Sequence, residues 1–146
     1  MEELKRLLLP YRAFVTYTPL RTEVDARALF DTGSAATYRV APRASLDPSV
    51  EAFDAMNACG ELSTAILIPG RRFDAFGTRH GQGGGWYDRF LARVPSGWLR
   101  VGFCFSDQFS LTPLIRNAWD QPMDYVCVLD RDTKALQIYA SGRLET

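Results

Sequence analysis

Glycines cluster in one short stretch of the sequence, GTRHGQGGGWYDRF, which runs from residue 77 to residue 90. The stretch follows an apolar run typical of a buried strand and leads into WYDRFLARV, a sequence typical of a helix. Ligands collect where strands end in open α/β sheets, and the free N–H groups of a helix's first turn attract anions. Because glycine lacks a Cβ atom, a phosphate can approach its backbone closely. The stretch therefore predicts a phosphate-binding loop, with a simple surface turn as the alternative.

The glycine pattern matches neither of the two common nucleotide fingerprints. A Walker A loop would continue as Gly-Lys-Ser/Thr, and no such continuation follows here. A dinucleotide-binding fold calls for an acidic residue about 20 residues further on. In that region Asp107 is the only candidate, so this fingerprint is not convincing either.

Charged residues on both sides of the glycines favour the phosphate interpretation. Arg79 precedes them and can form paired hydrogen bonds with phosphate oxygens. Asp88 falls in the first turn of the expected helix, where a carboxylate either offsets the helix dipole or ligates Mg²⁺. A second carboxylate comes from WDQPMD, which holds Asp120 and Asp124 directly before the last strongly apolar run. These carboxylates could hold Mg²⁺ against nucleotide phosphates.

The elements that must position these residues alternate between helix and strand. Apolar runs predict strands over residues 13–18, 37–41, 64–69, 99–105 and 124–129, with a weaker edge strand or hairpin return over 135–140. Helical patterns cover residues 2–9, 23–30, 48–59 and 86–94. Asp47 and Pro48 are typical of an N-cap and first helical residue, and Gly60 of a helix end. This alternation predicts an α/β fold with a mainly parallel sheet flanked by helices, in a single domain over residues 1–146.

Composition excludes several classes of protein. Lys and Arg together number 17, as do Asp and Glu, so a generally basic nucleic-acid binder is not indicated. The apolar run near the start, MEELKRLLLP, is too short for a membrane span or a signal peptide, so we expect a cytoplasmic protein. Cys59, Cys104 and Cys127 lie in or beside apolar runs and are expected to be buried free thiols. With His80 as the single histidine and no CxxC, a structural zinc site is not expected.

Three stretches of the sequence, in this order, carry a resemblance to a known family. They are FVTYTPLRTEVDARALF, then LIPGRRFDAFGTRHGQGGGWYDRFL, and finally VGFCFSDQ followed by WDQPMDYVCVL. They resemble three motifs of 5-formyltetrahydrofolate cyclo-ligases (methenyltetrahydrofolate synthetases). The first stretch resembles the family's Tyr-x-Pro-x-x-x-Glu-Val-Asp segment, and the second its Phe-Asp pair followed by Gly-x-Arg-Leu-Gly-x-Gly-Gly-Gly-Tyr-Tyr-Asp-Arg. The third resembles its closing Gly-x-x-Phe…Gln and Asp-x-x-x-Asp strand.

The resemblance implies a fold, a reaction and partners. The fold would be an α/β sheet of the sugar-isomerase and CoA-transferase type. The reaction would be the closure of 5-formyltetrahydrofolate, a reduced folate, to its 5,10-methenyl form, with ATP as co-substrate and Mg²⁺ as cofactor. Phosphorylation of the formyl oxygen makes it a good leaving group, so that N10 of the folate can attack the carbon. The protein's task would then be positioning and the neutralisation of charge.

The resemblance also assigns roles to residues of this sequence. Glu23 would bind the pterin ring and, with Arg79, act in catalysis. Asp88 and Asp120 would hold Mg²⁺. Gln82 and Trp86 would contact the folate. The ATP site would comprise Arg79, Gly81, Gly83, Gly84, Gly85, Trp86 and Tyr87. Apart from the resemblance, Glu23 is an ordinary acidic residue at a helix start, and Trp86 and Tyr87 are equally typical of core aromatics.

The sequence departs from the family in several places. His80 stands where the family usually has Leu, and Gln82 where it has an aromatic or basic residue. From the resemblance, we expect the family's N-terminal helix, whose Lys and Arg reach the ATP phosphates, to have no counterpart in these 146 residues. We expect Arg71 and Arg72 to take its place, and Arg89 to be the poorest aimed of the nearby bases. Weak activity, a requirement for a partner chain or homo-oligomer, and a noncatalytic nucleotide- or phosphate-binding module are the alternatives that these departures leave open.

Overall fold

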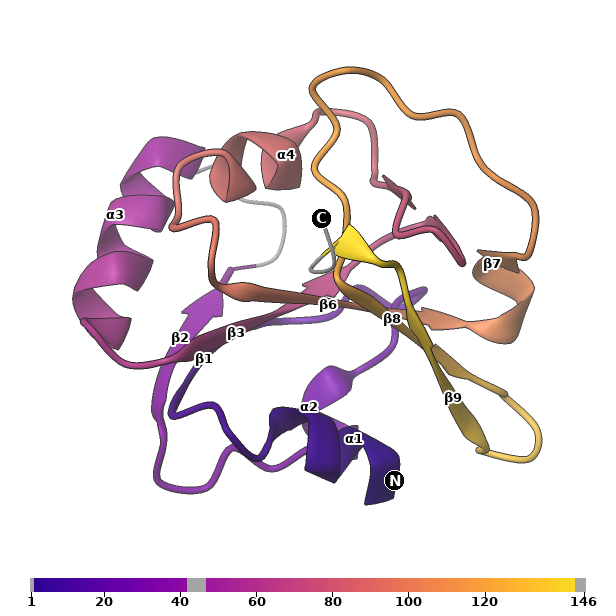
Figure 1. Ribbon diagram of the computed structural model, residues 1–146, viewed down its shortest axis with the longest axis horizontal. Coiled ribbons are helices and arrows are strands. Elements are labelled where there is room, and N and C mark those ends of the chain that lie inside the picture. Colours follow the sequence, from indigo (N-terminus) through magenta and orange to yellow (C-terminus); the bar gives the residue numbers. More distant parts are fainter. Residues whose placement is uncertain (1, 42–46, 144–146) are drawn as a thin grey trace.

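A largely parallel sheet forms the centre of the computed structural model, which describes residues 2–41 and 47–143 (Figure 1). Among these residues the sheet has six strands in the order β2-β1-β3-β6-β8-β9. Their bounds are β1 Ala13–Tyr17, β2 Ala36–Val40, β3 Thr64–Pro69, β6 Leu99–Phe105, β8 Tyr125–Leu129 and β9 Leu136–Ala140. All neighbouring pairs are parallel except β8 and β9, which form an antiparallel hairpin at the edge. The predicted mainly parallel α/β fold is confirmed, whereas the sugar-isomerase type remains a prediction.

Helices cover both faces of the sheet. In Figure 1, α3 (Pro48–Cys59) and α4 (Trp86–Leu91) lie on one face, and α1 (Glu2–Leu8) and α2 (Ala26–Leu29) lie on the other. Side chains of β3 therefore enter two cores in alternation: Ile66 packs with the residues of α3 and α4, and Leu67 with those of α1 and α2. A strand buried on both faces reads as a continuous apolar run, which is why this strand was predictable.

The helix ends follow the capping chemistry of the sequence, with two differences in extent. The Asp47 carboxylate accepts a hydrogen bond from the N–H of Ser49 at 2.8 Å, and Gly60 ends α3 with a φ of 58°, both as expected. The helix predicted over 23–30 is shorter, because Asp25 caps it and only Ala26–Leu29 is helical. The helix predicted over 86–94 ends at Leu91, where the N–H of Arg93 bonds the nearer carbonyl of Phe90.

A second, smaller sheet was not predicted. It joins β4 (Arg72–Asp74), β5 (Arg79–His80) and β7 (Phe109–Ser110) in the order β5-β4-β7. A 3₁₀ turn over Ser106–Gln108 connects β6 to β7. Strands of two or three residues carry no periodicity, so no sequence pattern reveals them. This small sheet sets the direction of the chain as it enters the glycine stretch.

Two expectations from composition can be compared with this structure. All three cysteines are buried and free, as predicted. Within residues 2–41 and 47–143, no helix is both long enough and apolar enough to cross a membrane.

Candidate functional site

A cavity of about 820 Å³ opens beside the carboxyl ends of three parallel strands. Tyr17 ends β1, Val40 ends β2 and Pro69 ends β3, and all three line the cavity. The structure brings every residue to which the resemblance assigns a site role into the wall of this one cavity: Glu23, Arg79, Gly81, Gln82, Gly83, Gly84, Gly85, Trp86, Tyr87, Asp88 and Asp120. Their convergence makes it the candidate site, because ligands of open α/β sheets bind at this edge.

The glycine loop presents bare backbone to the cavity. Gly83 and Gly85 have φ angles of 117° and 66°, a region that residues with side chains rarely adopt, and Gly85 is the N-cap of α4. Gly84 has no such angle. A Cβ atom added at any of the three would meet no protein atom within 4 Å. The fold itself thus requires glycine at 83 and 85 but not at 84, which suits the close approach of a ligand.

Arg79 is a buried cation that forms no ion pair with any described residue. Its side chain is on β5 with 8% of the residue exposed, and its Nε donates to the carbonyl of Pro69. Among the described residues no carboxylate lies within ion-pair distance of its guanidinium, which instead sits 4.7 Å from the ring centre of Tyr87. Burial lowers the pKa of Arg79. The charges of Asp88 and Glu23 act in the opposite direction, but the effect of burial is larger. An anion in the cavity would balance this buried charge.

Trp86 and Tyr87 combine the two roles that the sequence left open. Both line the cavity, and both also pack against the core beneath α3 and α4. The Trp86 ring stacks on Phe90 with centroids 5.2 Å apart and an angle of 14° between the planes. Burial raises the pKa of the Tyr87 hydroxyl, while the Arg79 charge lowers it. These aromatics therefore support the loop from below as well as facing the cavity.

The Asp88 carboxylate bonds the backbone directly after Asp120. Oδ1 of Asp88 accepts a hydrogen bond of 2.9 Å from the N–H of Gln121, the residue directly after Asp120. Oδ2 of Asp120 accepts one of 2.8 Å from the N–H of Asn117. Each carboxylate keeps one oxygen that accepts no hydrogen bond from a described residue. Hard oxygen donors of this kind suit Mg²⁺, which commonly takes its remaining ligands from phosphates and water.

Metal binding at this point would depend on such outside ligands. In the described part of the chain no group of three His, Cys, Asp or Glu side chains is placed to hold an ion. Asp124, the other acid of WDQPMD, is buried elsewhere and pairs with Arg143 at 2.7 Å. Two carboxylates with open positions therefore fit a metal brought by a nucleotide better than a permanent metal centre.

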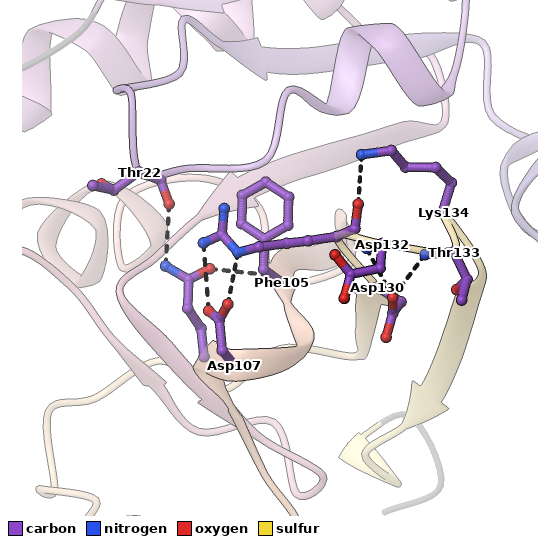
Figure 2. Close-up of polar contacts among 9 residues, drawn as sticks. Thr22, Phe105, Asp107, Asp130, Asp132, Thr133 and Lys134 are labelled. Carbon is purple, nitrogen blue, oxygen red and sulfur yellow. Dashed lines mark hydrogen bonds and ion pairs between the residues drawn. The ribbon is translucent and has the colours of Figure 1, made fainter.

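The segment that carries Glu23 is fastened to the end of β6. Glu23 accepts a hydrogen bond of 2.8 Å from the N–H of Leu20, which shapes its own turn. The Gln108 carboxamide donates to the carbonyl of Thr22 and accepts a hydrogen bond from the N–H of Phe105; Figure 2 labels Thr22 and Phe105. Gln108 belongs to a motif of the sequence analysis, but nothing in the pattern indicated this supporting contact.

The expected placement of the nearby bases was wrong. Arg71 and Arg72 are exposed and do not line the cavity, whereas Arg89 does. The small sheet explains the difference, because the N–H of Arg71 bonds the carbonyl of His80 and Arg72 pairs with the same residue. Arg89 sits in the last turn of α4, the helix that follows the glycine loop.

Sequence reasoning also missed the segment between β7 and β8. This segment arches towards α4 in Figure 1, and Ile115, Asn117 and Trp119 contribute to the cavity wall. Ile115 is 79% exposed and Trp119 68% exposed. Nε2 of His80 lies 2.7 Å from the Ile115 carbonyl and must be the donor, since a carbonyl only accepts. Apolar residues that follow neither a helical nor a strand period were the signal that the sequence offered.

Comparison with known proteins places this arrangement in a family. No curated protein sequence matches the chain. The fold is similar to that of a 5,10-methenyltetrahydrofolate synthetase from Mycoplasma pneumoniae, with a TM-score of 0.58 and 21% identity over 87% of this chain and 79% of the other. It is also similar to a 5,10-methenyltetrahydrofolate synthetase from Aquifex aeolicus, with a TM-score of 0.62 and 23% identity over 96% of this chain and 78% of the other. Because the sequence pattern of the 5-formyltetrahydrofolate cyclo-ligase family matches residues 1–129, the chain belongs to that family.

Proposed function

We propose that the chain uses Mg-ATP to close 5-formyltetrahydrofolate to 5,10-methenyltetrahydrofolate. The observation that carries this proposal is the buried Arg79, which has no anionic partner among the described residues and lines the same cavity as the bare glycine loop. A buried guanidinium is stabilised when a phosphate accepts its hydrogen bonds. Membership of the cyclo-ligase family supports this substrate class.

The residues of the cavity divide the work between charge and placement. Arg79 and the N–H groups of the glycine loop would hold the ATP phosphates and turn the γ-phosphate towards the formyl oxygen. Asp88 and Asp120 would hold Mg²⁺, which offsets phosphate charge when bound. Glu23, fixed by Leu20, would accept hydrogen bonds from the pterin ring. The γ-phosphoryl group moves to the formyl oxygen and ADP is released. N10 then attacks the formyl carbon and loses its proton, and inorganic phosphate leaves from that carbon.

Arg89 replaces Arg71 and Arg72 as the second base of the proposed ATP site. Among the described residues it is the other arginine that lines the cavity, and it is exposed rather than buried. An exposed base attracts phosphate more weakly than a desolvated one, because water screens its charge. Arg89 would therefore assist nucleotide binding, while Arg79 would orient the phosphates.

A noncatalytic nucleotide-binding module is the second candidate. The observation that favours it is the openness of the cavity on the side of Ile115 and Trp119, where large apolar side chains remain exposed. A cavity that leaves reacting groups in contact with water is a poor place for phosphoryl transfer. The glycine loop, Arg79 and the two carboxylates would still bind Mg-nucleotide in such a module.

The decisive experiment follows the absorbance of the methenyl product in a mixture of the protein, Mg-ATP and 5-formyltetrahydrofolate. We expect product that requires both ATP and Mg²⁺ and that disappears in the Arg79→Gln variant. Calorimetric titration with Mg-ATP accompanies the assay. Nucleotide binding without product would support the binding module, and the absence of both would refute the proposed site.

A further inference from the structure

Asp74 is a buried carboxylate that the proposed chemistry does not use. It ends β4, is 0% exposed, and does not line the cavity. Oδ1 accepts hydrogen bonds of 2.9 Å from the N–H groups of Phe76 and Thr78. Oδ2 accepts one of 2.8 Å from the N–H of Leu114, 40 residues further along the chain. One oxygen therefore shapes the β4–β5 turn, and the other reaches the segment between β7 and β8.

The turn shaped by Asp74 holds the same segment a second time. The Arg116 guanidinium donates to the Phe76 carbonyl at 2.8 Å and to Oγ1 of Thr78 at 2.9 and 3.1 Å. Arg116, two residues after Leu114, therefore forms a second set of hydrogen bonds to the same turn. Both attachments depend on the turn having the conformation that Oδ1 of Asp74 imposes.

Beyond Arg116 the contacts continue into the cavity wall. The N–H of Asn117 donates to Oδ2 of Asp120 at 2.8 Å, and the N–H of Gln121 donates to Oδ1 of Asp88 at 2.9 Å. An unbroken series of hydrogen bonds and adjacent residues therefore leads from buried Asp74 to the two carboxylates of the site. Asp74 touches neither carboxylate directly.

A buried carboxylate is costly unless hydrogen bonds satisfy it. A turn that needs only one side-chain acceptor for its backbone N–H groups can use a neutral Asn or Ser. An ionised carboxylate differs in accepting from several donors on different sides with both oxygens. At Asp74 this capacity joins the β4–β5 turn to Leu114, four residues beyond the β4–β7 pair of Asp74 with Ser110.

We propose that Asp74 is a positioning residue that sets the place of Asp120 relative to the glycine loop through residues 114–120. The inference rests on the proposed function, because it assigns a purpose to the placement of Asp120. It predicts that loosening this link weakens the help that Mg²⁺ gives to ATP binding. Binding of ATP without metal, which depends on Arg79 and the loop glycines, should stay unchanged.

The test is the Asp74→Asn substitution in the full chain. The amide oxygen can keep the two hydrogen bonds within the turn, but the amide NH₂ then faces the N–H of Leu114 and cannot accept from it. We expect amide exchange at Leu114 to become at least about tenfold faster, since a charge-assisted hydrogen bond is lost. In calorimetry, the gain in ATP affinity on adding Mg²⁺ should fall by about tenfold.

Two further variants make the result decisive. Asp124→Asn changes another buried carboxylate outside the cavity, and it should lower thermal stability without altering the Mg²⁺ effect. If Asp74→Asn does not fold, Arg116→Met breaks the second attachment while leaving the bonds of Asp74 in place, and the same fall in the Mg²⁺ effect on ATP affinity is expected without the faster exchange at Leu114.

The outcomes separate this inference from the proposed function. A folded Asp74→Asn protein with parental exchange at Leu114 and a parental Mg²⁺ effect would overturn the positioning role. Were the parent itself to show no Mg²⁺ effect on ATP binding, the proposed function would fail and so would the purpose assigned to Asp74. Unchanged exchange would then refute the mechanical link as well.

Discussion

Gly84 offers a direct test of whether the glycine loop holds a ligand. Its φ is not in the left-handed region, and a Cβ atom there would meet no protein atom within 4 Å. The Gly84→Ala substitution should therefore leave the fold intact. Because alanine restricts the unfolded chain more than glycine does, the free energy of unfolding should rise by up to about 1 kcal/mol.

Ligand binding should respond in the opposite direction. A methyl group at residue 84 occupies space on the cavity side of the loop, where a phosphate must approach the backbone. Forcing an extra methyl group into a filled space costs about 1–3 kcal/mol. This cost corresponds to a loss in Mg-ATP affinity of roughly 5- to 150-fold.

Calorimetric titration with Mg-ATP gives the affinity, and thermal unfolding of the same samples gives the change in stability. Gly97→Ala is the matched control, because Gly97 also has open space and no left-handed φ but lies outside the cavity. Gly83→Ala is a contrast, since its φ of 117° should cost about 1–3 kcal/mol of stability in addition to any effect on the ligand. If Gly84→Ala binds Mg-ATP as tightly as Gly97→Ala does, the loop is a surface turn and the phosphate interpretation is wrong.

Three other outcomes follow from the charges and thiols. In thermal unfolding, Mg-ATP should stabilise the parent protein but not the Arg79→Met variant. The unliganded variant should be at least as stable as the parent, because a buried charge with no partner among the described residues is removed. A melting temperature several degrees below that of the parent would contradict this. Arg89→Ala should weaken Mg-ATP binding several-fold by calorimetry, and the double replacement of Arg71 and Arg72 by Ala should not. Burial raises the pKa of the Cys104 thiol to about 12, with Asp107 adding to the effect, so only raising the pH towards that value would form the reactive thiolate in the folded protein. A thiol reagent at pH 8 should accordingly label the chain only after denaturation.

The long elements could be predicted because their signals are local. The run over Thr64–Pro69 is apolar at nearly every position, since helices cover both faces of the sheet. The helix over Pro48–Cys59 carries its own start in Asp47 and its own stop in Gly60. Patterns of this kind depend on residues within one element, so they survive without knowledge of the fold.

The parts that were missed depend on contacts between distant segments. The direction of Arg71 and Arg72 follows from pairing with His80 across a turn, and no periodicity records that pairing. Ile115 and Trp119 become wall residues only because hydrogen bonds to Asp74 and His80 hold their segment over the site. The residues of the glycine loop were brought together as expected, but their roles stay predictions.

The order of the strands also governs how the folded chain is reached. Each parallel pair in the sheet joins strands separated by a crossover. The chain therefore loses conformational entropy in closing the crossover before the contacts between the strands can stabilise it. The cavity walls come from residues 17–23, 40–41, 69, 79–89 and 115–120, and the last of these segments lies in the connection between β6 and β8. No early folding species that lacks the pairing of these two strands can possess the complete cavity. A refolding chain should therefore regain nucleotide binding only in its final step, and slowly compared with helical proteins of similar length.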